Sequence, residues 1–143
     1  MRETFRCFWH GPALTAYDVL SLRSVLAQSH RVVLYRYDPT LALPAGVEAG
    51  DANEIMPTET VLSYRPGPGA GSYALHANLF RYALLARLGG WYIDADVVML
   101  ERHPPAVETF AARQTAELAA VGVLRAHGLT DRVWPQHSAY PLH

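Results

Sequence analysis

The sequence predicts an α/β fold in which a mainly parallel sheet is flanked by helices, and three stretches carry that prediction. Thr4 to Trp9 is rich in aromatic and β-branched residues and ends at a turn, which is typical of a first strand. Val32 to Tyr37 is a nearly unbroken apolar run, as expected of a strand buried on both faces and reached by a right-handed crossover. His76 to Leu100 combines a helical pattern, a glycine pair and a further strand.

The first helix is predicted to begin at Thr15 and to end near Ser29. Thr15 and Asp18 fit a capping box, in which each side chain accepts from the other residue's backbone N–H. Apolar residues then repeat at helical spacing at Val19, Leu22, Val25 and Leu26. Farther on, Leu41 to Pro68 has no sustained period and many turn-forming residues, so it is predicted to be mainly loop with short elements.

The second helix and the strand after it lead to two carboxylates. An apolar stripe is predicted at Ala77, Phe80, Leu84 and Leu88, which places Asn78, Arg81 and Leu85 on the solvent-facing side. Gly89-Gly90 supplies a stop because glycine adopts left-handed backbone without steric cost. The run Trp91–Ile93 has strand composition and delivers Asp94 and Asp96 at its end.

The C-terminal part is predicted to add one more helix to a single domain spanning residues 1–143. Pro104-Pro105 opens this stretch, and Gly122 is a candidate kink. The residues predicted to share its face are Val107, Phe110, Ala111, Gln114, Leu118 and Val121. A proline- and aromatic-rich tail, RVWPQHSAYPLH, follows.

Composition narrows the classes of function. With 143 residues, 50% of them hydrophobic and 17% charged, the chain has enough apolar residues for a core. A formal charge of -1 gives no argument for binding nucleic acid. All twelve basic residues are arginine, which excludes mechanisms that need a lysine ammonium group. Cys7 is the single cysteine, and the sequence shows no signal peptide or membrane span, so we expect a cytoplasmic protein.

The pair Asp94 and Asp96 suggests a site that binds a divalent cation together with a diphosphate. Because side chains alternate along a strand, Asp94 and Asp96 project to the same side, where their charges repel unless a cation compensates them. Mg²⁺ and Mn²⁺ take carboxylate and phosphate oxygens, and the planar fork of Arg81 suits a diphosphate. By itself, a D-x-D pair at a strand end is equally compatible with acids that have no functional role.

Three motifs in a fixed order give the pair a context: FWHG near the start, NLFRYALL in the second helix, and GGWYIDADVV. Over about residues 5 to 100 the chain resembles the sugar-binding, D-x-D glycosyltransferases of the glycosyltransferase 32 type, which are related to capsular polysaccharide and mannosyl transferases. The resemblance implies a GT-A-like fold with its donor-binding part over 4–100, a nucleoside-diphosphate sugar donor and Mn²⁺ or Mg²⁺. It also implies a saccharide or lipid-linked acceptor, hexosyl transfer with retention, a place in bacterial polysaccharide biosynthesis, and a peripheral position at the inner face of a membrane.

The resemblance also implies roles for individual residues. Trp9 would stack near the donor base, with Gly11 allowing close backbone approach; core packing is the alternative for Trp9. Arg81 would contact the donor diphosphate or sugar, the alternative being a surface partner of Asn78. Asn78, where many relatives have aspartate, would contact a sugar hydroxyl.

For the acid pair, the resemblance implies that Asp94 contacts ribose or sugar and that Asp96 is the main metal ligand. His137 or His143 would be a metal or phosphate contact in the closing tail, with solvated histidines as the alternative. His10 and His76 receive no catalytic role, and no nucleophile or base is assigned.

Two tyrosines, Tyr35 and Tyr37, are candidates for the base pocket, with core packing as the alternative. The stretch between Asp96 and the tail is short for an acceptor-binding wall, so we expect a form shortened after the D-x-D strand. Two rival functions remain: a catalytically silent nucleotide-sugar-binding remnant, and a phosphatase of the haloacid dehalogenase type. The phosphatase site usually needs a lysine and a later acidic pair, and this chain has neither.

Overall fold

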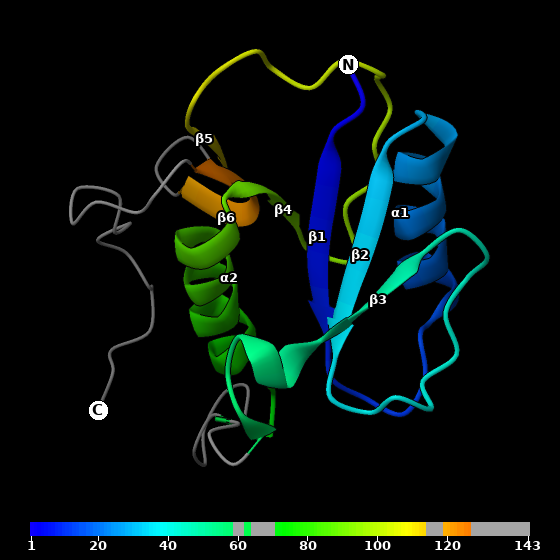
Figure 1. Ribbon diagram of the computed structural model, residues 1–143, viewed down its shortest axis with the longest axis vertical. Coiled ribbons are helices and arrows are strands. Elements are labelled where there is room, and N and C mark those ends of the chain that lie inside the picture. Colours follow the sequence, from blue (N-terminus) through cyan, green and yellow to red (C-terminus); the bar gives the residue numbers. More distant parts are fainter. Residues whose placement is uncertain (59–61, 64–70, 114–118, 127–143) are drawn as a thin grey trace.

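The computed structural model describes the chain except for residues 59–61, 64–70, 114–118 and 127–143, and it describes side chains up to residue 110 (Figure 1). Its elements are β1 (Thr4–Trp9), α1 (Ala16–Ala27), β2 (Arg31–Arg36), β3 (Glu48–Asp51), the short 3-10 helix η1 (Ala52–Glu54), α2 (Ala74–Leu88), β4 (Gly90–Ile93), β5 (Phe110–Arg113) and β6 (Ala119–Ala126). The predicted strand, helix, strand, loop, helix and strand up to Ile93 are confirmed.

The strands form one sheet in the order β3-β2-β1-β4-β6-β5. The first four are parallel to one another, whereas β6 pairs antiparallel with both β4 and β5. An α/β fold with a mainly parallel sheet is therefore confirmed, and it is consistent with the GT-A-like fold that the resemblance implies.

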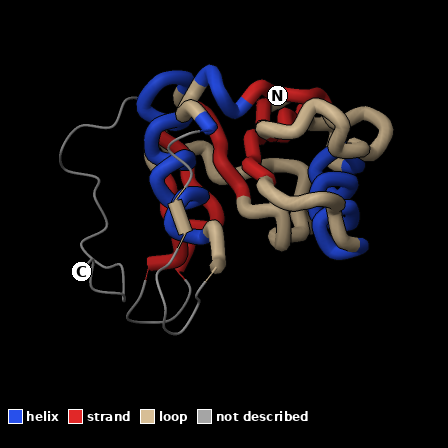
Figure 2. The backbone as a smooth tube through the Cα atoms, turned by 90° about the horizontal axis from the view of Figure 1, so that it is seen from below, coloured by secondary structure: helices blue, strands red, loops and turns tan. Residues whose placement is uncertain are grey.

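Helices cover both faces of the parallel strands, as Figure 2 shows with strands between the two long helices. Alternation along the strands sends successive side chains to opposite faces. The layer toward α1 contains Phe5, Cys7, Leu22, Val25, Val32, Leu34, Leu41, Trp91 and Ile93. The layer toward α2 contains Phe8, Tyr35, Ala52, Phe80, Leu84, Leu85 and Tyr92. Each helix thus closes its own hydrophobic core.

The predicted signals at two helix ends are present. Thr15 N–H donates to Asp18 Oδ2 over 2.6 Å and Asp18 N–H donates to Thr15 Oγ1 over 3.4 Å, which completes the capping box of α1. At the other helix, Gly89 is the C-cap of α2 with φ 60°, and Gly90 continues at φ 81°. Arg6 of β1 donates from Nη1 to Gly89 O over 3.0 Å, so a cation satisfies a carbonyl beyond the end of α2.

Two residues of α2 that were predicted to face solvent, Arg81 and Leu85, are buried. Arg81 and Leu85 are 3% and 1% exposed, whereas Leu88, which was placed in the apolar stripe, is 45% exposed. The reason is that α2 packs against a sheet, which buries a wider arc of the helix than the predicted stripe. The buried face is therefore rotated toward Arg81 and Leu85.

The predicted helix after Pro104-Pro105 was also wrong. Phe110–Arg113 is β5, and β6 brings Val123–Ala126 against Gly90–Ile93 of β4. Without that pairing, the outer edge of β4 would present unpaired N–H and C=O groups. Sheet completion outweighs the helical preference of this alanine-rich stretch. The tail histidines His137 and His143 lie outside the described residues.

The strand order reverses direction at β1, between β2 on one side and β4 on the other. From β1 the chain moves to β2 and β3 on one side, and then α2 carries it back to β4 on the other side of β1 (Figure 1). In open parallel sheets, ligands bind at the carboxyl ends of strands at such a reversal. Among the described residues, no helix is long and apolar enough to pass through a bilayer.

Candidate functional site

A pocket of about 310 Å³ lies at the carboxyl ends of β1 and β4. Its walls come from the end of β1, the first turns of α1 and α2, and the acid pair after β4. The lining residues are Phe8, Trp9, His10, Asp18, Tyr73, Ala74, Ala77, Asp94, Ala95 and Asp96. The pocket occupies the reversal point of the sheet and holds three carboxylates, those of Asp18, Asp94 and Asp96.

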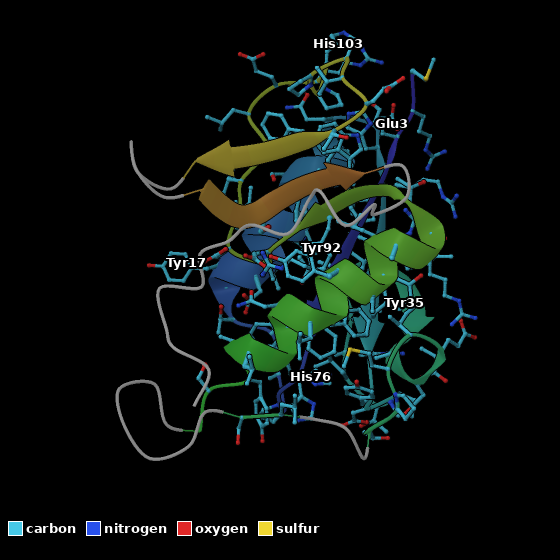
Figure 3. The ribbon with its side chains drawn as sticks, turned by 90° about the vertical axis from the view of Figure 1, so that its left-hand side faces the viewer. Glu3, Tyr17, Tyr35, His76, Tyr92 and His103 are labelled. Carbon is cyan, nitrogen blue, oxygen red and sulfur yellow. The ribbon has the colours of Figure 1, made fainter. Side chains whose placement is uncertain are left out.

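The carboxylate of Asp94 forms an ion pair with a buried arginine of α2. Arg81 Nη2 donates to Asp94 Oδ1 over 2.8 Å, with the two side chains 4% and 33% exposed. The guanidinium carbon also lies 4.9 Å from the ring centre of Tyr92, a cation–π contact that fixes the arginine from its other side. Figure 3 shows Tyr92 beside α2. Arg81 therefore orients Asp94 from within the core.

Opposing influences act on the Asp94 carboxyl. Burial raises the pKa of Asp94, the Arg81 charge lowers it, and the nearby Asp96 charge raises it again, with a net increase above the ordinary value. A cation bound at the pair would act in the same direction as Arg81 and favour the ionised form. The electrostatics of the pair thus favour a positively charged ligand.

Asp96 differs from Asp94 in exposure. Its side chain is exposed, and the structure shows no hydrogen bond or ion pair of its carboxylate with any described residue. Two carboxylates with oxygens facing one pocket suit Mg²⁺ or Mn²⁺, which commonly takes its remaining ligands from phosphate and water. Within the described ranges, no group of three or more His, Cys, Asp or Glu side chains is arranged to hold a metal ion. Two carboxylates would supply only part of the coordination of such a cation and would leave the remaining positions to phosphate oxygens and water.

A second pocket of about 320 Å³ adjoins the first at the carboxyl ends of β1 and β2. It is lined by Trp9, His10, Gly11, Pro12, Arg36, Asp38, Leu41 and Tyr73, so Trp9, His10 and Tyr73 border both pockets. One end of the combined groove is acidic, and the other combines aromatic and apolar surface with Arg36 and Asp38.

Trp9 and Gly11 lie together at this shared wall. A Cβ at Gly11 would come within 3.2 Å of Trp9 Nε1, so glycine lets the chain pass close to the indole ring. Trp9 Nε1 is buried and has no hydrogen-bond partner among the described residues. The side chain of Trp9 is partly buried against the core on the α1 side of the sheet, and it also lines both pockets.

The predicted residues on α2 do not line either pocket. Asn78 and Arg81 follow Ala74 and Ala77 on one helical face, since these positions are spaced three and four residues apart. Ala74 and Ala77 reach the first pocket, while Arg81 reaches it through Asp94. The predicted donor contacts of Asn78 and Arg81 remain predictions.

Two residues considered for the site belong to the interior. His76 is fully buried, and its Nδ1 accepts from Leu62 N–H over 3.3 Å. Its Nε2 therefore carries the proton and donates to Tyr37 Oη over 2.7 Å, while Tyr37 Oη donates to Met56 O. Tyr35 is buried against Phe80. Figure 3 shows Tyr35 and His76 on the α2 side of the sheet.

Among the lining residues with polar side chains, sequence reasoning missed Asp18, Tyr73, Arg36 and Asp38. Asp18 was assigned only a capping role, yet it lines the pocket while it caps α1. Arg36 and Asp38 flank the end of a predicted strand at the carboxyl edge, and that position was the available signal.

Residues 52–114 match the family model described as glycosyltransferase sugar-binding region containing DXD motif. The match covers just under half of the chain and includes α2, β4 and the acid pair, whereas Trp9 and Gly11 precede it. It supports a general glycosyl-transfer function. No curated protein and no solved structure matches the chain.

Proposed function

We propose that this protein is a glycosyltransferase that moves a sugar from a nucleoside-diphosphate sugar to a saccharide or other hydroxyl acceptor. The observation that supports it most is the position of Asp94 and Asp96. They border a pocket at the reversal point of the sheet, within the stretch that resembles D-x-D sugar-binding regions. The two adjoining pockets offer distinct surroundings for the two ends of such a donor.

The donor is expected to lie along the groove with its diphosphate at the acid pair. Asp94 and Asp96 would hold Mn²⁺ or Mg²⁺, and the bound cation would neutralise charge that develops on the leaving diphosphate. Trp9 would face the base in the pocket that also contains Arg36 and Asp38. Arg81 would support the diphosphate end through its ion pair with Asp94, and Asn78, one turn along α2 from Ala74 of the pocket wall, would contact the sugar. Retention of anomeric configuration is part of the proposal and rests on the family resemblance.

The decisive experiment is a screen of uridine and guanosine diphosphate sugars for Mn²⁺-dependent binding and hydrolysis. Asp96→Asn keeps the shape of the side chain but removes the charge, and we expect it to weaken Mn²⁺-dependent binding by about 10-fold or more, because the metal would lose a ligand. Glu108→Gln is the matched control, since Glu108 is an exposed acid that lines neither pocket. Equal binding by the wild type and Asp96→Asn would refute the proposed site.

The binding-only alternative gives a different result in the same screen. A silent nucleotide-sugar-binding protein would show Mn²⁺-dependent binding with no hydrolysis and no transfer to any hydroxyl acceptor. If turnover is found, the anomeric configuration of the product, read from the proton coupling of its anomeric centre by NMR, tests retention directly.

A further inference from the structure

The segment that follows the acid pair runs along α1 and the turn after it, and polar side chains of both hold it. Four contacts hold its backbone: Ser21 Oγ donates to Val97 O over 2.5 Å, Ser24 Oγ accepts from Met99 N–H over 2.8 Å, Gln28 Nε2 donates to Leu100 O over 3.4 Å, and His30 Nε2 lies 2.7 Å from Arg102 O. The four side chains and the four backbone groups that they contact follow one another in the same sequence order. We call residues 97–102 the strap.

The C-terminal end of the strap is held by His30. The hydrogen bonds of its ring define which nitrogen carries the proton. Glu3 N–H donates to His30 Nδ1 over 3.1 Å, so that nitrogen carries no proton. His30 Nε2 therefore bears the proton and donates to Arg102 O. His30 is only 2% exposed, so the imidazole ring itself is shielded from water. The strap is anchored at this end to the start of β1.

The near end of the strap lies directly beside Asp96. Ser21 is fully buried, and its hydroxyl holds the carbonyl of Val97, the next residue after Asp96. On the other side, Val97 N–H donates to Asp94 O over 3.2 Å in a turn. The backbone between these two bonds fixes the direction of the Cα–Cβ bond of Asp96, and so the side of the chain from which its carboxylate projects.

The same helix also reaches the pocket. Asp18 lines the first pocket, and Ser21 and Ser24 follow it at successive intervals of three residues on α1. Ser24 adds a link within the helix, since its Oγ donates to Ser21 O over 2.6 Å. One face of α1 therefore carries both a carboxylate of the pocket wall and the hydroxyls beneath the backbone that presents Asp96.

We propose that Ser21 and Ser24 are positioning residues that hold Asp96 in the orientation in which it binds a divalent cation together with a nucleoside diphosphate. The inference rests on the proposed function. The serines line neither pocket, and they act through the backbone of the strap. Groups that orient metal ligands in this indirect way typically change metal affinity by about 10- to 100-fold when removed.

The test compares hydroxyl removal with hydroxyl retention at the same position. Ser21→Ala and Ser24→Ala each delete a bond to the strap, Ser24→Thr keeps the hydroxyl, and Ser63→Ala is a control at an exposed serine. Free Mn²⁺ is followed by electron paramagnetic resonance during titration of the full chain in the presence of uridine diphosphate. We expect about 10-fold weaker Mn²⁺ binding for each alanine variant at the strap and nearly unchanged binding for Ser24→Thr and Ser63→Ala.

A second readout does not depend on any ligand. Amide hydrogen exchange is expected to accelerate at Met99, whose N–H loses its acceptor in Ser24→Ala, while β1 and β2 keep wild-type protection. If Ser21→Ala does not fold, the Ser24→Ala and Ser24→Thr pair decides the question.

The outcomes separate this inference from the proposed function. Wild-type protein that binds Mn²⁺ only with the diphosphate, alongside folded serine variants that bind it equally well, would overturn the positioning role and leave the function standing. Wild-type protein that binds no Mn²⁺ under these conditions would overturn both.

Discussion

The carboxyl group of Asp94 lies between a buried guanidinium and a second carboxylate two residues along the chain. Arg81 contacts it over 2.8 Å and is itself almost entirely buried. A protonated carboxyl is a poor ligand for a cation, so the protonation of Asp94 determines when the pair can bind one. Its raised pKa therefore has a direct consequence for the site.

The first prediction concerns the titration of this carboxyl in the metal-free protein. Arg81→Met is expected to raise the pKa of Asp94 further because the favourable charge is lost, and Asp96→Asn is expected to lower it because a repelling charge is lost. Carbon-detected NMR of the side-chain carboxyl measures both. Shifts of the same sign in the two variants would contradict this account of the site.

The pH dependence of cation binding follows with a fixed sign. Because the pKa of Asp94 is raised, affinity for Mn²⁺ should fall on acidification at a higher pH than an ordinary aspartate would give. Arg81→Met should move that loss to a still higher pH. Calorimetric titrations with Mn²⁺ and uridine diphosphate at several pH values measure the midpoint, with Glu108→Gln as the control that should leave it unchanged.

At the level of residues, the sequence predicted the acids of the site but not the burial of the arginine. The D-x-D spacing and its place after a strand were sufficient to bring Asp94 and Asp96 to one pocket. Arg81 was expected to face solvent because charged residues usually do, and local periodicity does not reveal a buried partner. Asp18 was missed because its contact with the pocket depends on how α1 packs beside β4.

The junction between α2 and β4 is the element on which the acid pair depends. Gly90 has φ 81°, and a Cβ there would lie 2.7 Å from Arg6 Nη1. Displacing that nitrogen would break its bond to Gly89 O. The junction thus combines a left-handed backbone with a polar contact to β1.

Gly90→Ala is expected to lower the free energy of unfolding by about 2–3 kcal/mol, from backbone strain together with the lost hydrogen bond. Gly71→Ala is a matched control, because Gly71 has nearly the same φ, 79°, with nothing within 4 Å of a Cβ. It should cost only the strain, about 1–2 kcal/mol. Urea unfolding measures both. In an Arg6→Met background the difference between the two should largely vanish, and a persistent difference would contradict the assigned role of Arg6.

At the level of elements, the strands β1, β2 and β4 and the helices α1 and α2 were predictable because each has a local signal. These strands have apolar, aromatic and β-branched composition, α1 has a capping box, and α2 has a glycine stop. The strands β5 and β6 were not predictable in this way. Their pairing satisfies the edge of β4, a requirement that arises only after the rest of the sheet exists.

The whole molecule should respond to its ligands through binding linkage. A ligand bound only by the folded state stabilises it, by about 2.7 kcal/mol at a concentration of 100 times Kd. For a domain of this size, that corresponds to a rise in Tm of roughly 5–15 °C. We expect this rise with Mn²⁺ and uridine diphosphate together and a much smaller one in Asp96→Asn, measured by differential scanning calorimetry. A rise of equal size in Asp96→Asn would place the binding elsewhere.

The pairing of β1 with β4 also bears on the order in which the molecule folds. Phe5 and Trp91 are register partners, although α1, β2, β3 and α2 lie between them in the sequence. Contacts between residues so distant in sequence close loops at a high entropic cost and form slowly, whereas β1, α1 and β2 form a compact local unit. The acid pair meets the end of β1 only when this last closure occurs. Recovery of Mn²⁺-dependent nucleotide binding during refolding would therefore report completion of the native topology, later than the appearance of helical structure.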